Sequence, residues 1–199
     1  MSVVTNTHDI HDGDASARPC VFVISGPTAV GKGTLIRIIK QRYPDVYVSI
    51  SATTRQPRPT ETDGVDYFFV TDAEFDDLIT HDGLLEWAEV HGSTRYGTPR
   101  KAVSDAVAAG KTVILEIDLQ GARQIRRTMP DAVQIFIQPP SWDELVRRLR
   151  GRGSETKEQQ QRRLQTARIE MDAAAEFDHI VVNDVLGETV NTLVSLLGL

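Results

Sequence analysis

Cysteine is the scarcest feature of this chain, with one in 199 residues, so no disulfide can form within it. A lone thiol is typical of proteins in a reducing compartment, and we expect a cytoplasmic location. Cys20 opens an apolar run, which predicts a small core residue rather than a reactive thiol. The length suffices for one α/β domain with a core of ordinary size.

Long apolar runs are missing too: no stretch is long enough to cross a membrane, and we see no secretory signal at the N-terminus. Positive charge is in deficit, with 22 Lys and Arg against 28 Asp and Glu and a net charge of −6. This balance argues against a nucleic-acid binder. Small-molecule partners are therefore expected, without nucleic acid or membrane, and the oligomeric state stays open.

What the sequence does contain is the spacing Gly-x4-Gly-Lys directly after an apolar, β-branched run at 21–24. Between a strand and a helix this spacing predicts a phosphate-binding loop, whose inward-pointing amides form an anion nest. Lys32 can reach the outer phosphates of a nucleoside triphosphate. Gly33 stands where many such loops carry a Mg²⁺-binding hydroxyl, so we expect phosphates and water to hold the metal, with Thr34 as a helper at most. The expected phosphate-binding residues are Gly26, Pro27, Thr28, Ala29, Val30, Gly31, Lys32, Gly33 and Thr34.

Strand patterns alternate with helix patterns, which predicts an α/β fold with a mostly parallel sheet covered by helices on both faces. We expect ligands at the carboxyl ends of its strands. Capping-box patterns begin at Thr71 and Ser141. Expected strands span 20–25, 46–50, 66–70, 84–90, 94–97, 112–118, 133–138 and 179–182; expected helices span 32–42, 72–81, 101–109, 141–150, 156–176 and 188–197. The expected organisation is a flexible tail (1–18), a core (19–50 and 99–199) and a mostly β insertion (51–98).

Two arginines, Arg55 and Arg58, flank a Gln-Pro pair. On a proline-stiffened loop they predict a pre-organised phosphate clamp, because guanidinium groups donate bidentately and stay charged. Tyr67 and Tyr96 can add hydroxyl donors. On these residues alone, a solvated basic loop beside core aromatic residues is an equal alternative. A cluster of further arginines, a local positive focus on an acidic chain, also suits a ligand with several phosphates; its members are Arg147, Arg148, Arg150, Arg152, Arg162, Arg163 and Arg168.

From about Pro19 to the C-terminus, these segments together resemble guanylate kinase, which moves the γ-phosphoryl group of ATP onto GMP. The sequence departs from the family at Ala29, where glycine is usual, and we expect a slight perturbation of the loop. The motifs that carry the resemblance are Ser25-Gly26-Pro27…Gly31-Lys32-Gly33-Thr34, Ser51-x-Thr-Thr-Arg55-x-Pro57-Arg58, Gly64-x-Asp66-Tyr67-x-Phe69, Glu86-Trp87-Ala88, Tyr96-Gly97-Thr98, Glu116-Ile117-Asp118-x-Gln120-Gly121, Pro139-Pro140-Ser141, Arg148-Leu149-x-Gly151-Arg152-Gly153 and Val182-Asn183-Asp184.

The resemblance implies ATP and GMP as ligands, Mg²⁺ as cofactor and a role for each motif. Guanine presents N–H donors that carboxylates accept, whereas adenine lacks them and would leave a buried carboxylate unpaired. The GMP phosphate would be held by Ser51, Arg55, Arg58, Tyr67 and Tyr96, and guanine recognised by Glu86, Thr98 and Asp118. A lid at about 141–168 would bring Arg148, Arg152 and Arg163 to the ATP phosphates, and together with Lys32 and Arg55 these are the expected catalytic residues. Asn183 would contact adenine, and Asp118, with Glu116 as a second candidate, would organise Mg²⁺ through water.

Two other functions compete with this one. Guanylate-kinase-like modules in scaffold proteins bind phosphopeptides without catalysis, but an intact Lys32 and the lid arginines argue against that. A related kinase could use another acceptor, such as a phosphorylated sugar. The retained trio Glu86, Thr98 and Asp118 argues against this second alternative.

Overall fold

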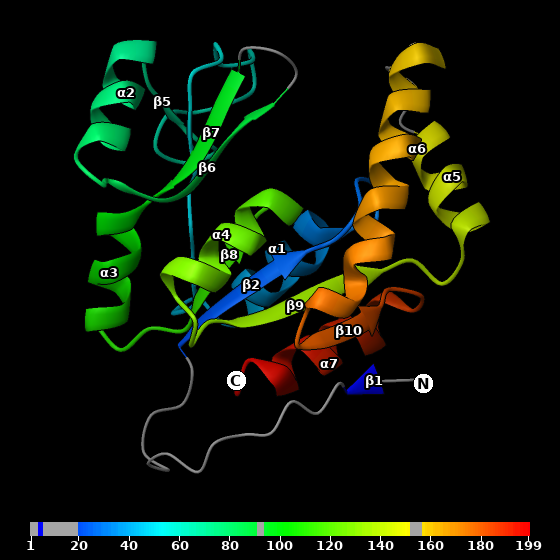
Figure 1. Ribbon diagram of the computed structural model, residues 1–199. Coiled ribbons are helices and arrows are strands. Elements are labelled where there is room, and N and C mark those ends of the chain that lie inside the picture. The colour runs from blue at the N-terminus through cyan, green and yellow to red at the C-terminus, as the bar shows by residue number, and fades with distance from the viewer. Residues whose placement is uncertain (1–3, 6–19, 91–93, 152–156) are drawn as a thin grey trace.

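The computed structural model describes residues 4–5, 20–90, 94–151 and 157–199. Figure 1 shows a central sheet with helices on both faces, an insertion on one side above it and a helical pair on the other. Within the described part of the chain, no helix is long and apolar enough to cross a membrane. The predicted α/β fold is confirmed.

The main sheet has six strands in the order β1-β10-β9-β2-β8-β3. All neighbours are parallel except β1, which pairs antiparallel with β10 at the edge. The two residues of β1 lie in the segment expected to be a tail, so this part of it adds an edge strand. The strands are β1 (Val4–Thr5), β2 (Val21–Ser25), β3 (Tyr47–Val48), β8 (Val113–Glu116), β9 (Val133–Gln138) and β10 (His179–Val182).

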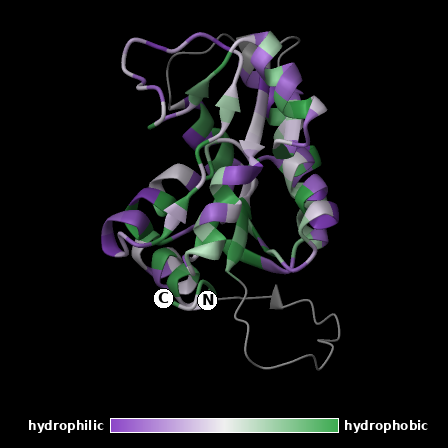
Figure 2. Ribbon diagram, turned by 90° about the vertical axis from the view of Figure 1, so that its left-hand side faces the viewer, coloured by the Kyte–Doolittle hydropathy of each residue, from purple (hydrophilic) through white to green (hydrophobic). Residues whose placement is uncertain are grey.

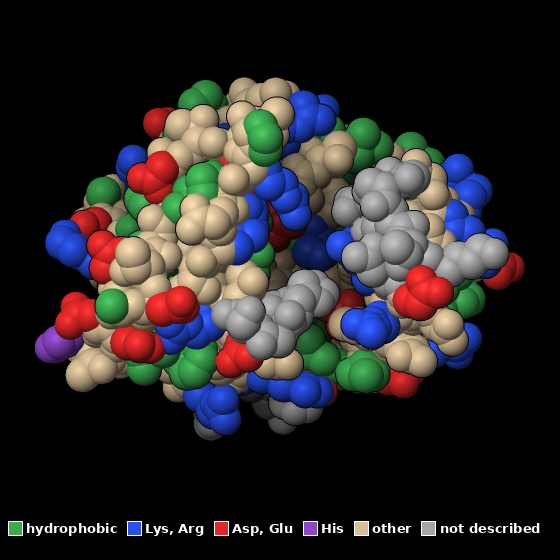
Figure 3. Space-filling view, turned by 90° about the horizontal axis from the view of Figure 1, so that it is seen from above, with side chains coloured by type: hydrophobic (Ala, Val, Ile, Leu, Met, Phe, Trp, Pro, Cys, Tyr) green, Lys and Arg blue, Asp and Glu red, His purple; other side chains and the backbone are tan. Residues whose placement is uncertain are grey.

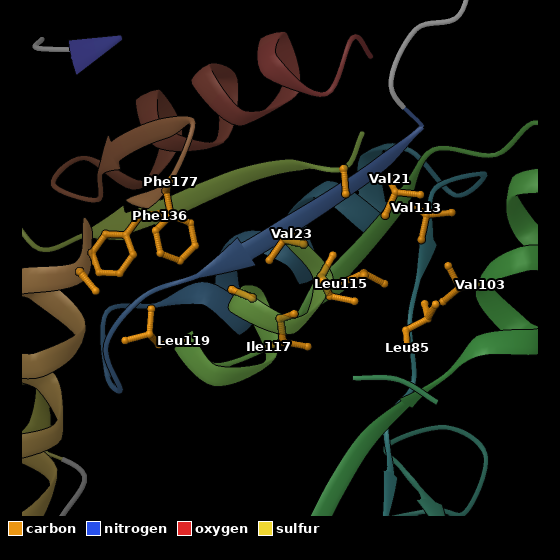
Figure 4. Close-up of a cluster of buried hydrophobic side chains, with 14 of the residues drawn as sticks. Val21, Val23, Leu85, Val103, Val113, Leu115, Ile117, Leu119, Phe136 and Phe177 are labelled. Carbon is orange, nitrogen blue, oxygen red and sulfur yellow. The ribbon is translucent and has the colours of Figure 1, made fainter. Parts of the chain in front are cut away.

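Strand β2 is buried along its whole length because helices cover both faces of the sheet. Val21 and Val23 point into one apolar cluster with α3, α4 and the 3₁₀ turn η1, whereas Phe22 and Ile24 point into the other with α1 and α7. Figure 4 shows the first cluster, which Leu85 of the insertion also joins. In Figure 2 the central strands are mostly hydrophobic, whereas the helices carry both hydrophobic and hydrophilic residues, because each helix buries only one of its faces. The helices are α1 (Lys32–Arg42), α3 (Arg100–Ala108), α4 (Leu119–Thr128), α5 (Trp142–Arg150), α6 (Lys157–Asp172), η1 (Ala173–Glu176) and α7 (Leu186–Leu196).

The insertion is a four-stranded sheet in the order β5-β4-β7-β6, with α2 packed against it. Phe75 of α2 is fully buried and anchors the helix to Ala52 and Leu84 of the sheet. The predicted capping box at Thr71 and Glu74 is present in both directions. The elements are β4 (Ala52–Thr53), β5 (Phe68–Phe69), α2 (Asp72–Thr80), β6 (Leu84–Val90) and β7 (Thr94–Pro99).

Three local features differ from the sequence predictions. Helix α4 was not predicted, although Asp118 caps it and Ile125 is among its buried residues. The capping box at Ser141 is half formed: Ser141 accepts the Glu144 N–H, but the Glu144 carboxylate accepts from two arginines of the same helix instead. The expected helix at 156–176 ends in the 3₁₀ turn η1.

Candidate functional site

The predicted phosphate loop joins β2 to α1 at the carboxyl edge of the sheet. Its backbone turns through positive φ angles at Gly26 (141°), Ala29 (64°) and Gly31 (105°). A left-handed conformation costs an alanine roughly 1–2 kcal/mol, which is a physical reason for glycine being the usual residue at Ala29. The loop borders a cavity of about 400 Å³, and Figure 3 shows a hollow with Lys and Arg side chains around it. The residues around the cavity are Pro27, Thr28, Ala29, Gly31, Lys32, Gly33, Thr34 and Glu116.

Lys32 curls back across this loop. Its ammonium group donates to the Gly26 carbonyl at 2.5 Å and to the Pro27 carbonyl at 3.4 Å. Glu116, at the end of β8, lies across the cavity, and its carboxylate oxygens are 3.9 Å from the position a Cβ on Gly33 would take. Burial raises the pKa of Glu116, and the charge of Lys32 opposes that rise. The cavity is thus lined by both a cation and a carboxylate.

The structure brings two predicted lid arginines to the same loop. Arg148 donates to the Val30 carbonyl at 3.3 Å and to the backbone carbonyl of Asn183 at 3.1 Å. Arg163 donates to the Thr28 hydroxyl at 3.4 Å. The third, Arg152, lies outside the described residues.

Asn183 is buried and supports the loop. Its side-chain amide donates to the Val30 carbonyl at 2.8 Å, and a Cβ on Gly31 would approach that amide to 2.6 Å. This contact explains why the loop backbone packs closely against the end of β10. The adenine contact expected of Asn183 stays a prediction.

The two arginines of the predicted phosphate clamp have different surroundings. Arg55 is largely buried and donates to the Tyr96 hydroxyl at 3.0 Å, while its guanidinium lies 4.8 Å from the centre of the Tyr67 ring. The Arg58 side chain is 73% exposed. Ser51 lies at the start of the insertion sheet, where its carbonyl accepts the Phe68 N–H. The structure therefore brings Arg55, Tyr67 and Tyr96 together and leaves the Arg58 guanidinium open to solvent.

The predicted guanine residues meet where the insertion contacts α4. Glu86 of β6 is buried and accepts a hydrogen bond of 2.6 Å from the Thr98 hydroxyl of β7. Burial raises the pKa of Glu86 to about 7, with a further contribution from the negative charge of Asp118. Asp118 has a structural role as well, because one of its oxygens caps α4 by accepting the Gly121 N–H at 2.8 Å. Because the Glu86 carboxylate is shielded from water, it can discriminate between ligands that offer N–H donors and ligands that do not.

Gly121 has to be a glycine for Glu86 to stand where it does. A Cβ at this position would lie 2.7 Å from Oε2 of Glu86, closer than any real contact allows. Gly121 belongs to one of the motifs that carry the family resemblance, but the sequence alone does not show this steric reason for the glycine.

For the guanine site that the resemblance implies, Gly121→Ala should weaken GMP binding by up to about 100-fold, because a misplacement of about 1 Å in a binding group can cost that much. The measurement is the KM for GMP, with the KM for ATP as internal reference. Gly187→Ala is the matched control, since a Cβ there meets no atom within 4 Å. An unchanged KM in Gly121→Ala would mean that Glu86 is not held by this contact.

Sequence reasoning missed two carboxylates. Glu61 pairs with Arg55 at 2.6 Å. The only sequence feature that could have indicated this pair is its position three residues after Arg58, on the loop that carries both arginines. Glu170 lies on α6, and burial raises its pKa to about 7 while the charge of Lys32 opposes that rise. Its signal was helical spacing: Arg163, the fully buried Ala167 and Glu170 share one face of the helix.

For a divalent cation, the cavity offers a hard-oxygen donor set. The Thr34 hydroxyl and the Glu116 carboxylate border it, and Asp118 follows the same strand as Glu116. Among the described residues, no group of three His, Cys, Asp or Glu side chains is placed to hold a metal. How Mg²⁺ is held stays a prediction.

Comparisons with known proteins agree with this geometry. A family model described as guanylate kinase matches residues 17–198. The guanylate kinase of Cutibacterium acnes is 60% identical over 179 residues, which cover 90% of each chain. That of Thermobifida fusca is 57% identical over 176 residues, covering 88% of this chain and 89% of the relative. The crystal structure of guanylate kinase from Anaplasma phagocytophilum matches with a TM-score of 0.71 at 32% identity, covering 90% of this chain and 85% of that one.

Proposed function

Because this chain belongs to the guanylate kinase family and transfers the γ-phosphoryl group of ATP to GMP, giving ADP and GDP, we propose the following division of work among its residues. One observation carries the proposal: Glu116, at the end of β8, borders the phosphate-loop cavity, and Asp118, two residues later, acts by its charge on the buried Glu86. Glu116 also interacts electrostatically with Lys32 of the loop and with Tyr67 of the phosphate clamp. The core (19–50 and 99–199) binds ATP, the insertion (51–98) binds GMP, and the lid (about 141–168) closes over ATP.

On the ATP side, the backbone amides of residues 26–34 hold the phosphates and Lys32 neutralises the charge that develops on the transferred group. Phosphoryl transfer needs alignment and charge neutralisation more than covalent help. The contacts of Arg148 and Arg163 with the loop support their role as lid cations, since Arg148 reaches the Val30 carbonyl and Arg163 reaches the Thr28 hydroxyl. Arg152 completes the set, and Asn183 contacts adenine.

On the GMP side, the phosphate is held by Ser51, Arg55, Arg58, Tyr67 and Tyr96. Guanine is held by Glu86, Thr98 and Asp118. The ionised Glu86 carboxylate accepts the guanine N–H donors, while Thr98 orients that carboxylate through its 2.6 Å hydrogen bond. Adenine offers no N–H in their place, so AMP would leave a buried charge unpaired.

Mg²⁺ is the cofactor, bound with ATP. It would be held by phosphates and water, with Thr34, Glu116 and Asp118 nearby, and it would neutralise phosphate charge. ATP and GMP are the partners, nucleic acid and membranes are not, and the reaction takes place in the cytoplasm, as the lone cysteine suggests.

An acceptor screen tests the assignment. ADP production is measured with ATP, Mg²⁺ and each of GMP, dGMP, AMP, CMP, UMP and a phosphorylated sugar. We expect GMP to be preferred over AMP by about 10⁴-fold in kcat/KM. ADP formation with a phosphorylated sugar but not GMP would indicate another acceptor, and no turnover with any acceptor would favour a binding module.

A further inference from the structure

Glu61 lies between the two arginines of the phosphate clamp. Its carboxylate receives both terminal nitrogens of Arg55, at 2.6 and 2.8 Å. One of its oxygens also accepts the backbone N–H of Arg58 at 2.8 Å. The side chain is only 12% exposed. A single carboxylate thus ties the beginning, the middle and the end of the loop 55–61 together.

The hydrogen bonds of Arg55 restrict what it can offer a ligand. Within the described part of the chain it donates four: two to Glu61, one to the Gln56 carbonyl and one to the Tyr96 hydroxyl. A guanidinium carries five N–H groups. While Glu61 stays in place, Arg55 therefore cannot donate to a phosphate through both of its terminal nitrogens.

The same contacts prepare the other donors. Because the Tyr96 oxygen accepts from Arg55, its own proton is free to point elsewhere, and Tyr67 lies beside it with ring centres 5.8 Å apart. The Arg58 guanidinium is exposed and lies 3.8 Å from one Glu61 oxygen, while the Arg58 backbone N–H donates to the other. Displacing Glu61 would leave a backbone N–H and an arginine fork without their charged partner, which costs more than a neutral hydrogen bond.

We propose that Glu61 is a positioning residue for the GMP phosphate: it stays bound to Arg55 and fixes the loop, so that Tyr96, Tyr67 and Arg58 present their donors to the phosphate. It acts through Arg55 and the backbone of Arg58 and does not touch the substrate. This inference rests on the proposed assignment of the clamp to GMP.

Glu61 carries its charge at neutral pH. Its hydrogen bonds from Arg55 and from the Arg58 backbone hold the pKa of Glu61 down at about 2. Glu61→Gln keeps the size of the side chain but turns one acceptor oxygen into a donor nitrogen. The fork of Arg55 then loses one of its two matching acceptors.

The test is a double-mutant cycle of Glu61→Gln and Arg55→Ala, with binding of GMP and of guanosine measured by calorimetry. We expect Glu61→Gln to weaken GMP at least about tenfold, as loss of a hydrogen bond to a charged group does, while guanosine binding changes less than about twofold. In the Arg55→Ala background, Glu61→Gln should have little further effect, because the remaining oxygen of Gln can still accept the Arg58 N–H.

Asp76→Asn is the matched control. Asp76 pairs with Arg95, which neighbours Tyr96 in β7 but faces α2 on the opposite side of the sheet, over the Phe75 ring. This variant removes a carboxylate–arginine pair from the same insertion and should leave GMP affinity unchanged.

Each of the other outcomes contradicts either the positioning role of Glu61 or the assignment of the clamp to the GMP phosphate. Tighter GMP binding by Glu61→Gln would show that Glu61 competes with the phosphate. Unchanged GMP binding in Glu61→Gln, with a loss in Arg55→Ala, would overturn the positioning role alone. No loss in Arg55→Ala would instead remove Arg55 from the clamp, and equal losses of GMP and guanosine would indicate damage to the whole insertion.

Discussion

Lys32→Ala should lower kcat by at least about 100- to 1000-fold while GMP affinity stays nearly unchanged. The expected size is that of removing one pre-organised donor from a developing oxyanion. Lys32 lies on the phosphate loop, where its ammonium group is held at the Gly26 carbonyl, and the GMP residues come from other elements. Because its cation acts on charge that grows in the transition state, its loss affects turnover more than substrate binding.

Steady-state kinetics with ATP and calorimetry with GMP provide this measurement. Lys40→Ala is the control, since Lys40 is a lysine of the same helix that donates to the carbonyls of Pro44 and Val46, away from the cavity. It should keep full turnover. A Lys32→Ala enzyme that loses GMP affinity as strongly as turnover would contradict the assignment of Lys32 to the ATP phosphates.

Glu86→Gln should weaken GMP by about 100- to 1000-fold. The amide oxygen would accept from Thr98, and the amide nitrogen would then face the N–H donors of guanine. The variant therefore loses a charged hydrogen bond and brings donors together. Phosphate contacts are untouched, so the loss should be the same for guanosine. A normal GMP affinity would remove Glu86 from the guanine site.

The same variant should change the pH dependence. The pKa of Glu86 is raised from 4.5 to about 7, so the native state holds this proton more tightly than the unfolded chain. The free energy of unfolding then falls as pH rises between these values and levels off above about 7. Glu86→Gln has no titrating group at this position, so its free energy of unfolding does not fall in this way. At pH 8 it should melt at a higher temperature than the wild type, by about 2–4 °C for each kcal/mol of unfolding free energy that it keeps.

Guanosine is the ligand for the matching binding test, because it has no phosphate that titrates. Wild-type affinity for guanosine should fall as pH drops below about 7, since a protonated Glu86 accepts fewer hydrogen bonds. The Gln variant should not show this dependence. Glu170 has a pKa of about 7 as well, but it acts on the phosphate-loop side, so the difference between the two proteins isolates Glu86.

Much of the fold could be predicted from short stretches of sequence. Strand β2, helix α1 and the capping box of α2 follow from apolar runs, periodicity and capping residues, and the structure confirms them. Helix α4 was not predicted, although its apolar residues Leu119, Ala122 and Ile125 recur at helical spacing. Asp118 supplies the other sign of this helix, because it caps α4 in addition to the binding role that the resemblance implies.

By itself, the sequence determined the phosphate loop, the alternation of strands and helices, and the family, because these depend on consecutive residues: backbone freedom at glycine, apolar period and the order of motifs. Only the tertiary structure decided that Glu61 ties Arg55 to the clamp loop, that Gly121 leaves room for Glu86, and that Asn183 supports the Val30 carbonyl. Two of these three contacts join elements far apart in the chain, and the third depends on a loop shape that the prolines allow without dictating. Their distances follow from how the insertion, α4 and the end of β10 dock on the sheet, and no local pattern of residues encodes that docking.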